Sequence, residues 1–148
     1  MLSHIQSALA GSRNARNTAN VVITSFMLSF PMSRISIHLP MPPSTNLIWR
    51  SDRGRVHKSK AYSDWLKQAG YEWLRQRKEQ PRNISGNFRA ILILDSTQRS
   101  RKDLDNRIKA ILDFCTENQI VDDDKFCDAL LVKWGLAPMG AQIILRGH

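Results

Sequence analysis

The clearest hydrophobic pattern in the chain begins at Arg34, where apolar and polar residues alternate. Ile35, Ile37 and Leu39 occupy every second position. A period of two predicts a half-buried β-strand, because successive side chains of a strand point to opposite faces. The stretch Pro40–Pro43 contains three prolines and ends the strand, since proline lacks an N–H group and restricts the residue before it.

Two later stretches have apolar residues three or four positions apart, as in amphipathic helices. The first runs from about Ser59, which can cap the helix, to Lys78, and the second starts between Asp103 and Asp105 and ends near Asn118. Their apolar positions are Tyr62, Trp65, Leu66, Ala69, Trp73 and Leu74 in the first, and Ile108, Ile111, Leu112 and Cys115 in the second. Strands are also predicted at Phe88–Leu94, Ala129–Trp134 and Gln142–Leu145.

The first 33 residues differ from the rest of the chain. They contain no Asp or Glu, are rich in Ser, Asn and Ala, and carry Arg13 and Arg16 as their strong charges before Arg34. This composition is typical of a targeting peptide or a disordered extension. We expect residues 1–33 to be a non-essential extension, with Met32 as an alternative start, and residues 34–148 to form one domain of ordinary size.

The charge balance indicates that this small domain has a polyanionic partner. The chain has 22 Lys and Arg against 13 Asp and Glu, a formal net charge of +9. Nucleic acid fits this excess, although a ribosomal or membrane-surface protein has a similar balance. The apolar stretch from Val21 to Phe30 is too short and too polar to span a bilayer, and Cys115 and Cys127 lack zinc-site spacing. We therefore expect a cytoplasmic protein with reduced thiols.

Acidic residues are clustered at two places in this basic chain, Asp103 with Asp105 and then Asp122–Asp124. Carboxylates repel phosphates, and a divalent cation removes that conflict. Mg²⁺ prefers hard oxygen ligands and usually takes a few carboxylates, with waters and substrate phosphate. Two residues apart, Asp103 and Asp105 share a face only in extended backbone, so we expect Asp103 to precede the helix.

Each of these signals also has a structural explanation that is commoner when spacing alone is considered. Asp103 or Asp105 can cap the helix, and Asp122–Asp124 can form an acidic turn. Lys109 lies four residues after Asp105, where it can either contact a phosphate or form a surface ion pair with that carboxylate.

Two longer motifs favour the functional interpretation. Leu39–Asn46 reads LPMPPSTN and is followed by RGRVHKS at Arg53–Ser59, and Arg101–Asn106 reads RKDLDN and is followed by Lys109 and Val121–Asp123. In order and spacing these motifs resemble the RusA family of Holliday-junction resolvases, from Arg34 onward. Trp49 stands where that family usually has tyrosine, and the N-terminal extension has no counterpart.

The resemblance implies a small single-domain α/β (α+β) fold, with a mixed β-sheet flanked by helices, that forms a homodimer. It also implies an endonuclease that resolves four-way junctions in DNA recombination and repair with Mg²⁺, for which Mn²⁺ can substitute. Asp103, Asp105 and Asp123 match the catalytic metal-binding carboxylates, Lys109 matches a functional lysine, and Asp122 matches a supporting acid. A bacterial or prophage origin and association with the nucleoid follow from the same resemblance.

Two basic segments are candidate DNA-binding surfaces. The first is a predicted loop around Gly54, with Trp49 as a platform on which an unpaired base could stack or, alternatively, as a core residue. The second leads directly into the acidic residues, where phosphate contacts would deliver the scissile linkage. Their members are Trp49, Arg50, Arg53, Arg55, His57 and Lys58 in the first, and Arg99, Arg101 and Lys102 in the second. Solvated charge is the alternative for the second segment, and an exposed polar loop residue is the alternative for His57.

Two other functions remain open from the sequence. A phage-type nuclease for flaps or forks would use the same residues on another branch geometry. A catalytically silent nucleic-acid-binding protein would use the aspartates only to cap a helix and fill a turn. Dependence on Mg²⁺ separates this last possibility from the nucleases, since a binder needs no divalent ion and weakens smoothly with salt.

Overall fold

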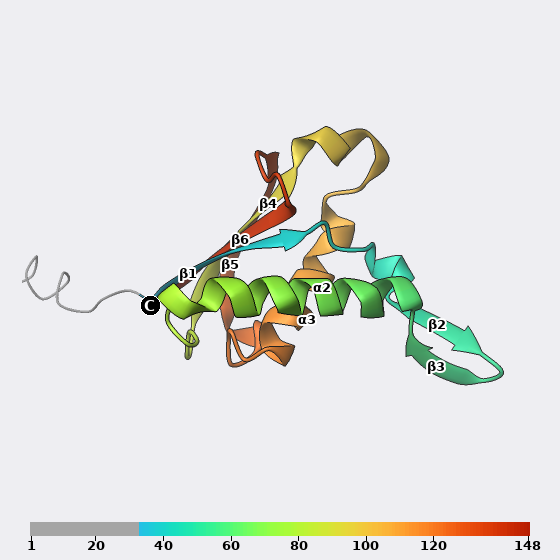
Figure 1. The fold of residues 1–148 in the computed structure, drawn as a ribbon. Coiled ribbons are helices and arrows are strands. Elements are labelled where there is room, and N and C mark those ends of the chain that lie inside the picture. The colour runs from blue at the N-terminus through green and yellow to red at the C-terminus, as the bar shows by residue number, and fades with distance from the viewer. Residues whose placement is uncertain (1–32) are drawn as a thin grey trace, which may run out of the picture. The chain divides into compact units, whose positions relative to one another are not determined.

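The computed structural model describes residues 33–148, so the expectations for the N-terminal extension lie outside the described residues apart from Ser33. This part of the chain is a single small domain of mixed α+β type, as predicted (Figure 1). Its main sheet has four strands, in the order β1-β6-β4-β5. The strands are β1 (Arg34–Pro40), β4 (Phe88–Asp95), β5 (Cys127–Gly135) and β6 (Gly140–Gly147), and the helices are α2 (Lys60–Gln76) and α3 (Ile108–Glu117).

The connection between β4 and β5 decides where the acidic residues lie. β6 is antiparallel to both β1 and β4, whereas β4 and β5 are parallel. Parallel neighbours require a crossover, and α3 supplies it. One acidic segment lies before α3 and the other after it, so both belong to this crossover.

The core lies between one face of the sheet and the two helices. Ile35, Ile37 and Leu39 on β1 are fully buried, which confirms the alternation. On α2 the N–H of Tyr62 donates to the Ser59 hydroxyl (3.1 Å), as expected for the cap. The other buried residues of these elements include Trp65, Ala69 and Trp73 on α2, Ala110, Ile111, Phe114 and Cys115 on α3, Phe88, Ala90, Leu92 and Leu94 on β4, and Ala141, Ile143 and Leu145 on β6.

One predicted core position is wrong. Leu74 is 57% exposed, while its neighbour Trp73 is 4% exposed. At about 100° per residue, Trp73 lies roughly 20° around the helix from Tyr62, whereas Leu74 lies roughly 120° away. The aromatic residue therefore takes the core-facing position and Leu74 faces outward.

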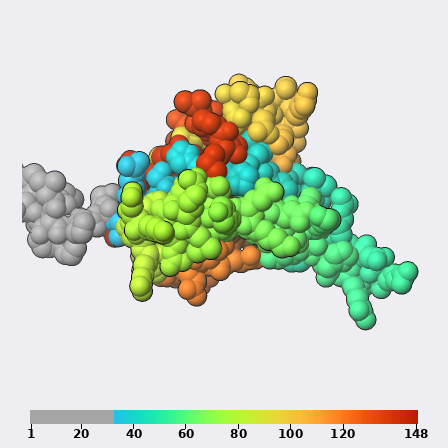
Figure 2. Space-filling model, in the orientation of Figure 1, coloured from blue at the N-terminus to red at the C-terminus, as the bar shows by residue number. Residues whose placement is uncertain are grey.

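The stretch predicted as a basic loop is a β-hairpin, formed by β2 (Trp49–Asp52) and β3 (Arg55–Lys58). Arg53 and Gly54 make the turn with φ of 48° and 79°. Two consecutive positive φ values are the feature of type I′ turns, whose twist suits two antiparallel strands. The hairpin projects from the domain near the start of α2 (Figures 1 and 2). Its strands are polar and mostly exposed, so no alternation of hydrophobic residues indicated them.

The face of the sheet opposite the core carries an arginine row that the sequence did not indicate. Arg34 pairs with Arg146, and Arg146 pairs with Arg89 on the next strand. The adjacent row is apolar and contains Ile144 and Ile91. Strand register across the sheet produces both rows, and register cannot be read from a strand in isolation.

Neither cysteine forms a disulfide, in keeping with the expected free thiols. Burial raises the pKa of Cys115 to about 12, so this thiol stays protonated and unreactive at neutral pH. Among the described residues, no helix is both long enough and apolar enough to cross a membrane.

Candidate active site and nucleic-acid interface

The first acidic segment lies in the connection between β4 and α3. Asp103 and Asp105 are both exposed, and Asp105 is the first residue of a short 3₁₀ turn, Asp105–Arg107. Asp103 therefore precedes the helix, as predicted. The intervening residue Leu104 has helical backbone (φ −66°, ψ −49°), so the expected extended geometry between the two acids is wrong. Because the chain forms this turn immediately before α3, Asp103 and Asp105 are not related as two residues on one face of a strand.

The helix-cap explanation for these acids has no hydrogen bond to support it. Neither the 3₁₀ turn nor α3 is capped by a side chain. The one hydrogen bond of the Asp103 carboxylate comes from the side-chain amide of Asn106 (3.3 Å), and within residues 33–148 neither Asp103 nor Asp105 forms an ion pair. Both carboxylates are thus free to bind a cation.

The two sequence motifs meet at this turn. The Thr45 hydroxyl donates to the carbonyl of Asn106 (3.1 Å), and the Arg107 guanidinium donates to the carbonyl of Pro42 (2.7 Å). Burial lowers the pKa of Arg107, and the charge of Asp103 opposes this shift. The proline-rich segment therefore holds the acidic turn in place, although the paired residues are more than sixty positions apart in the chain.

Lys109 forms a surface ion pair, which was the alternative to phosphate contact, but with another carboxylate. Its ammonium contacts the Asp113 carboxylate at 2.8 Å, so Asp105 as the partner is wrong. Asp113 lies one turn further along the same α-helix, whereas Asp105 lies in the 3₁₀ turn outside it. The hydrogen bond with Asp113 raises the pKa of Lys109, and the nearby charge of Asp124 contributes in the same direction.

The influence of Asp124 on Lys109 shows how the second acidic segment approaches the first. Lys109 is near the start of α3, while Asp124 follows the end of that helix. The chain reverses after α3, where Ile120 donates its N–H to the Cys115 carbonyl (2.8 Å). A second short 3₁₀ turn, Asp124–Phe126, then packs against α3. The return segment thus runs back toward the acidic turn.

Asp122 has a structural role in this return segment. Its carboxylate accepts hydrogen bonds from the Ser85 hydroxyl (2.6 Å), the Gly86 N–H (3.1 Å) and the Asn83 amide (3.5 Å). The bonds with Ser85 and Gly86 lower the pKa of Asp122, because they stabilise the charged form. Asp122 therefore ties the loop before β4 to the segment that carries Asp123.

We expect Asp122→Ala to lower the melting temperature at pH 7 by removing these three bonds. A carboxylate with a lowered pKa stabilises the fold above its unfolded pKa of about 3.9, and this contribution is lost as the pH falls through the lowered value. The difference from the wild type should therefore shrink below about pH 4. Melting curves between pH 2.5 and 7, with roughly half-unit steps, measure this.

Asp52→Ala is the matched control, because Asp52 is exposed and has no hydrogen-bonded side-chain partner within residues 33–148. It should leave the melting temperature unchanged. An Asp122→Ala deficit that is equally large at pH 7 and pH 2.5 would contradict the assigned role.

Asp123 combines a turn function with a partly exposed carboxylate. It accepts a hydrogen bond from the Lys125 N–H (2.9 Å) and pairs with the Lys125 ammonium at 3.2 Å. These interactions lower its pKa, with the bond from the Lys125 N–H as the largest cause. The acidic-turn explanation therefore describes the local geometry of Asp123, and its carboxylate remains charged at neutral pH.

The donor chemistry of the site fits Mg²⁺. Carboxylates are hard oxygen ligands, and Mg²⁺ is commonly held by one or two of them with waters and substrate phosphates. Within residues 33–148, no three His, Cys, Asp or Glu side chains are close enough together to hold a metal ion. Asp103, Asp105 and Asp123 therefore do not form such a cluster, and their role as metal ligands stays a prediction.

The basic residues form two separate surfaces. Trp49 is 52% exposed, so the alternative that its side chain packs in the core is wrong. Cross-strand pairing places Arg50 opposite His57, and Trp49 opposite Lys58. Lys58 is already engaged by Glu117 (2.8 Å). The remaining basic residues of the hairpin are exposed and form no ion pair with another described residue; they are Arg50, Arg53, Arg55 and His57.

The second basic surface is a 3₁₀ helix, Ser96–Arg101, between β4 and the acidic turn. Arg99 and Arg101 are exposed, and Lys102 is hydrogen-bonded to Gln98. Burial lowers the pKa of Lys102, and the charge of Arg107 acts in the same direction. The two arginines thus stand next to Asp103 with their guanidinium groups available for phosphate.

A mixed α+β domain with exposed carboxylates beside basic surfaces is typical of enzymes that act on nucleic-acid phosphodiesters. The family model of endodeoxyribonuclease RusA matches residues 40–145 of this chain. The chain therefore belongs to the RusA endodeoxyribonuclease family, as the two motifs indicated. A search of curated proteins found no match.

Proposed function

We propose that this protein is a Mg²⁺-dependent endonuclease that resolves four-way DNA junctions by paired symmetric nicks. Membership of the RusA endodeoxyribonuclease family supports this function. In this chain the observation that supports it is the pair of exposed carboxylates, Asp103 and Asp105. Their turn is held to the proline-rich motif by the hydrogen bonds of Thr45 and Arg107.

In this mechanism the basic residues bind and orient the DNA backbone. Arg99, Arg101 and Lys102 contact the phosphates next to the acidic turn, and the hairpin contacts a second region of the junction, with Trp49 stacking on an unpaired base. The other hairpin residues in this role are Arg50, Arg53, Arg55, His57 and Lys58. His57 contacts phosphate rather than transferring a proton, because it lies among cations.

The acidic residues act at the phosphodiester to be cut. Asp103, Asp105 and Asp123 would hold the cation, which would supply polarisation of the phosphate and ionisation of water when bound. Lys109 exchanges Asp113 for the phosphate and offsets the charge that develops there. Water adds to phosphorus and the bond to the 3′ oxygen breaks, which leaves a 3′-hydroxyl and a 5′-phosphate that a ligase can rejoin.

The alternative of a silent DNA-binding protein has one observation in its favour, because Asp123 and Lys109 both have ionic partners within the described residues. Binding and nicking of a labelled junction, each measured over a series of salt and Mg²⁺ concentrations, separate the two functions. The nuclease requires Mg²⁺ for nicking, with Mn²⁺ able to replace it. A binder shows affinity that falls with salt and no nicking with either ion.

Two symmetric nicks require two equivalent active sites, which a two-fold homodimer supplies most simply. We propose the outer edge of β5 as the contact between subunits. At the other end of the sheet, Gln76 and Gln80 cover the edge of β1 with side-chain hydrogen bonds to Ser36 and His38 (2.7–2.9 Å). β5 has no such cover from the described residues, and Leu131 on it is 53% exposed. An uncovered edge strand readily pairs with another chain.

Leu131→Lys is therefore expected to convert the dimer to a monomer, because it places a charge at the paired edge. Light scattering coupled to size-exclusion chromatography measures the mass directly. Leu136→Lys is the matched control, since Leu136 is 84% exposed in the turn after β5 and should not affect the dimer. A monomeric wild type would refute the dimer, and a Leu131→Lys dimer would refute this interface.

A further inference from the structure

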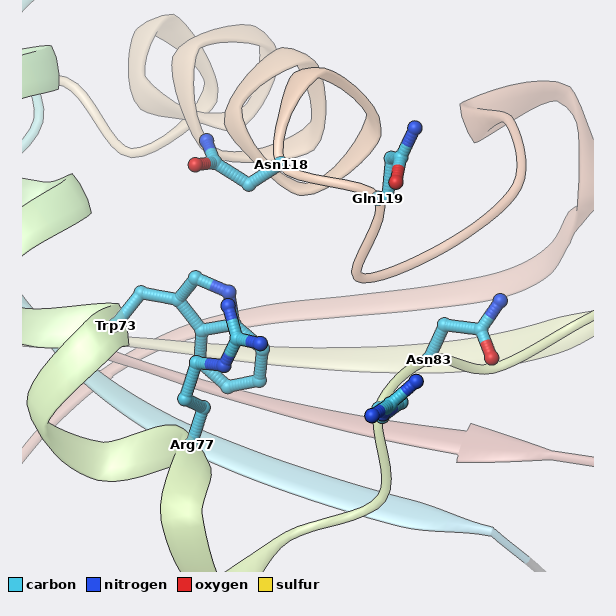
Figure 3. Close-up of a pocket in the computed structure, with 6 residues that line it drawn as sticks. Trp73, Arg77, Asn83, Asn118 and Gln119 are labelled. Atoms are coloured by element: carbon cyan, nitrogen blue, oxygen red, sulfur yellow. The ribbon is translucent and has the colours of Figure 1, made fainter.

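A polar hollow of about 420 Å³ lies between the end of α2, the loop before β4 and the end of α3 (Figure 3). Trp73 and Arg77 border it from the end of α2 and the turn that follows, and Asn118 and Gln119 border it from the end of α3. Arg82 and Asn83, in the loop before β4, complete the lining. Three segments that are distant in the sequence thus enclose one hollow.

The side chains that line this hollow are hydrogen-bond donors, and two of them are positively charged. It consists of two guanidinium groups, three carboxamides and one indole, and no carboxylate lines it. Neither Arg77 nor Arg82 forms an ion pair with another residue in the range 33–148. Guanidinium and amide N–H groups together suit an anion with several oxygen acceptors, and arginine in particular suits phosphate.

The walls of the hollow are well anchored. Trp73 belongs to the core, and Ile84 and Ile120, next to two of the lining residues, are fully buried. The Ile84 N–H donates to the Ile120 carbonyl (2.9 Å), which joins the loop to the segment after α3. The two walls are therefore held at a defined separation before any ligand binds.

The hollow is also joined to the acidic segment. Asn83, which lines it, donates to the Asp122 carboxylate (3.5 Å), and Ser85 and Gly86 of the same loop bind that carboxylate at 2.6 and 3.1 Å. Asp122 is the immediate neighbour of Asp123. The hollow therefore lies next to the segment that carries Asp123.

We infer that the hollow between Arg77, Arg82 and Gln119 is a binding site for a DNA backbone phosphate that flanks the one cut. This inference rests on the proposed function, because it assigns the site to the same DNA substrate. The flanking contact fixes the register of the strand relative to Asp123. It is separate from the hairpin and from the arginines before the acidic turn.

The test measures junction affinity without divalent ions, so that cleavage plays no part. Arg77→Gln/Arg82→Gln removes two charges from the hollow, and Lys67→Gln/Lys78→Gln removes two charges from residues of α2 and the following turn that do not line it. Dissociation constants for a labelled four-way junction are measured at several salt concentrations for both variants and the wild type. Melting temperatures verify that each variant is folded.

The arginine variant should bind the junction at least ~10-fold more weakly and reduce the slope of log K against log salt by about 1 to 2, because each phosphate contact releases counterions. Arg77→Lys/Arg82→Lys, which keeps both charges, should retain most of that slope. The lysine-to-glutamine control should stay within about threefold of the wild type.

If the arginine and control variants lose affinity equally while the wild type binds tightly, this site is refuted and the proposed nuclease function is untouched. If the wild type binds no branched DNA at all, the proposed function fails and this inference fails with it.

Discussion

Asp105→Asn is expected to lower the rate of junction nicking at least ~10²-fold, the scale typical for loss of one charged group at a reacting centre. The substitution keeps the shape of the side chain and removes the negative charge that would hold Mg²⁺. Asp105 is exposed and has no ion pair among the described residues, so folding should be unaffected. Single-turnover nicking of a labelled junction measures the rate, and a gel-shift assay verifies that DNA binding is retained.

Asp64→Asn is the matched control for this experiment. Asp64 is partly exposed on α2, where its one ion-pair partner among the described residues is Lys60 (2.6 Å). Asp64→Asn removes one negative charge, as Asp105→Asn does, but from a residue outside the crossover between β4 and β5. Nicking should therefore proceed at the wild-type rate. Equal rates for Asp105→Asn and the wild type would remove Asp105 from the mechanism.

Phe114→Ala is expected to reduce the free energy of unfolding by about 3–5 kcal/mol, the usual cost of removing a large buried aromatic side chain. Phe114 is fully buried and packs edge-on against Trp65, with ring centroids 5.7 Å apart. The contact joins α3 to α2, so the loss weakens the crossover that carries both acidic segments. Urea denaturation followed by tryptophan fluorescence measures the change.

Leu74→Ala gives the comparison on the outward face of α2. Leu74 shares the helical hydrophobic pattern but is 57% exposed, and its truncation should cost no more than about 0.5 kcal/mol. A loss of less than about 1 kcal/mol for Phe114→Ala would show that α3 is not held by this contact.

Local patterns were sufficient to predict most of the fold. The alternation at Ile35, Ile37 and Leu39 and the spacing along α2 both reflect how side chains alternate on a strand or recur on a helix. The hairpin at Trp49–Lys58 was missed because its strands are exposed on both faces and have no burial to produce a pattern. Its turn also lacks the Asn-Gly or Asp-Gly pair that usually indicates a two-residue hairpin.

The residues of the candidate site stay a prediction, and the contact that Lys109 makes could not be predicted from spacing. Lys109 has an acid four residues away on each side, Asp105 and Asp113, and spacing could not distinguish them. The distinction depends on α3 beginning at Ile108, which leaves Asp105 in the 3₁₀ turn and Asp113 on the helix. Chain spacing is informative only within one regular element.

Contacts between distant segments could not be predicted at all. The bonds from Asp122 to Ser85 and from Thr45 to Asn106 depend on the sheet order and on the reversal after α3. The same is true of the polar hollow, whose arginines looked like ordinary surface charge in the sequence. A single sequence records which groups are present, while the topology decides which of them meet.

To test whether the protein resolves four-way junctions with Mg²⁺, the purified protein is incubated with labelled four-way junction, flap and linear duplex DNA, each with and without Mg²⁺. We expect paired symmetric nicks in the junction alone, only when Mg²⁺ is present, with ends that a ligase can rejoin. Preferential cutting of the flap would show a nuclease for another branch geometry. Tight binding to the junction without cleavage in Mg²⁺ or Mn²⁺ would contradict the account and leave a DNA-binding protein.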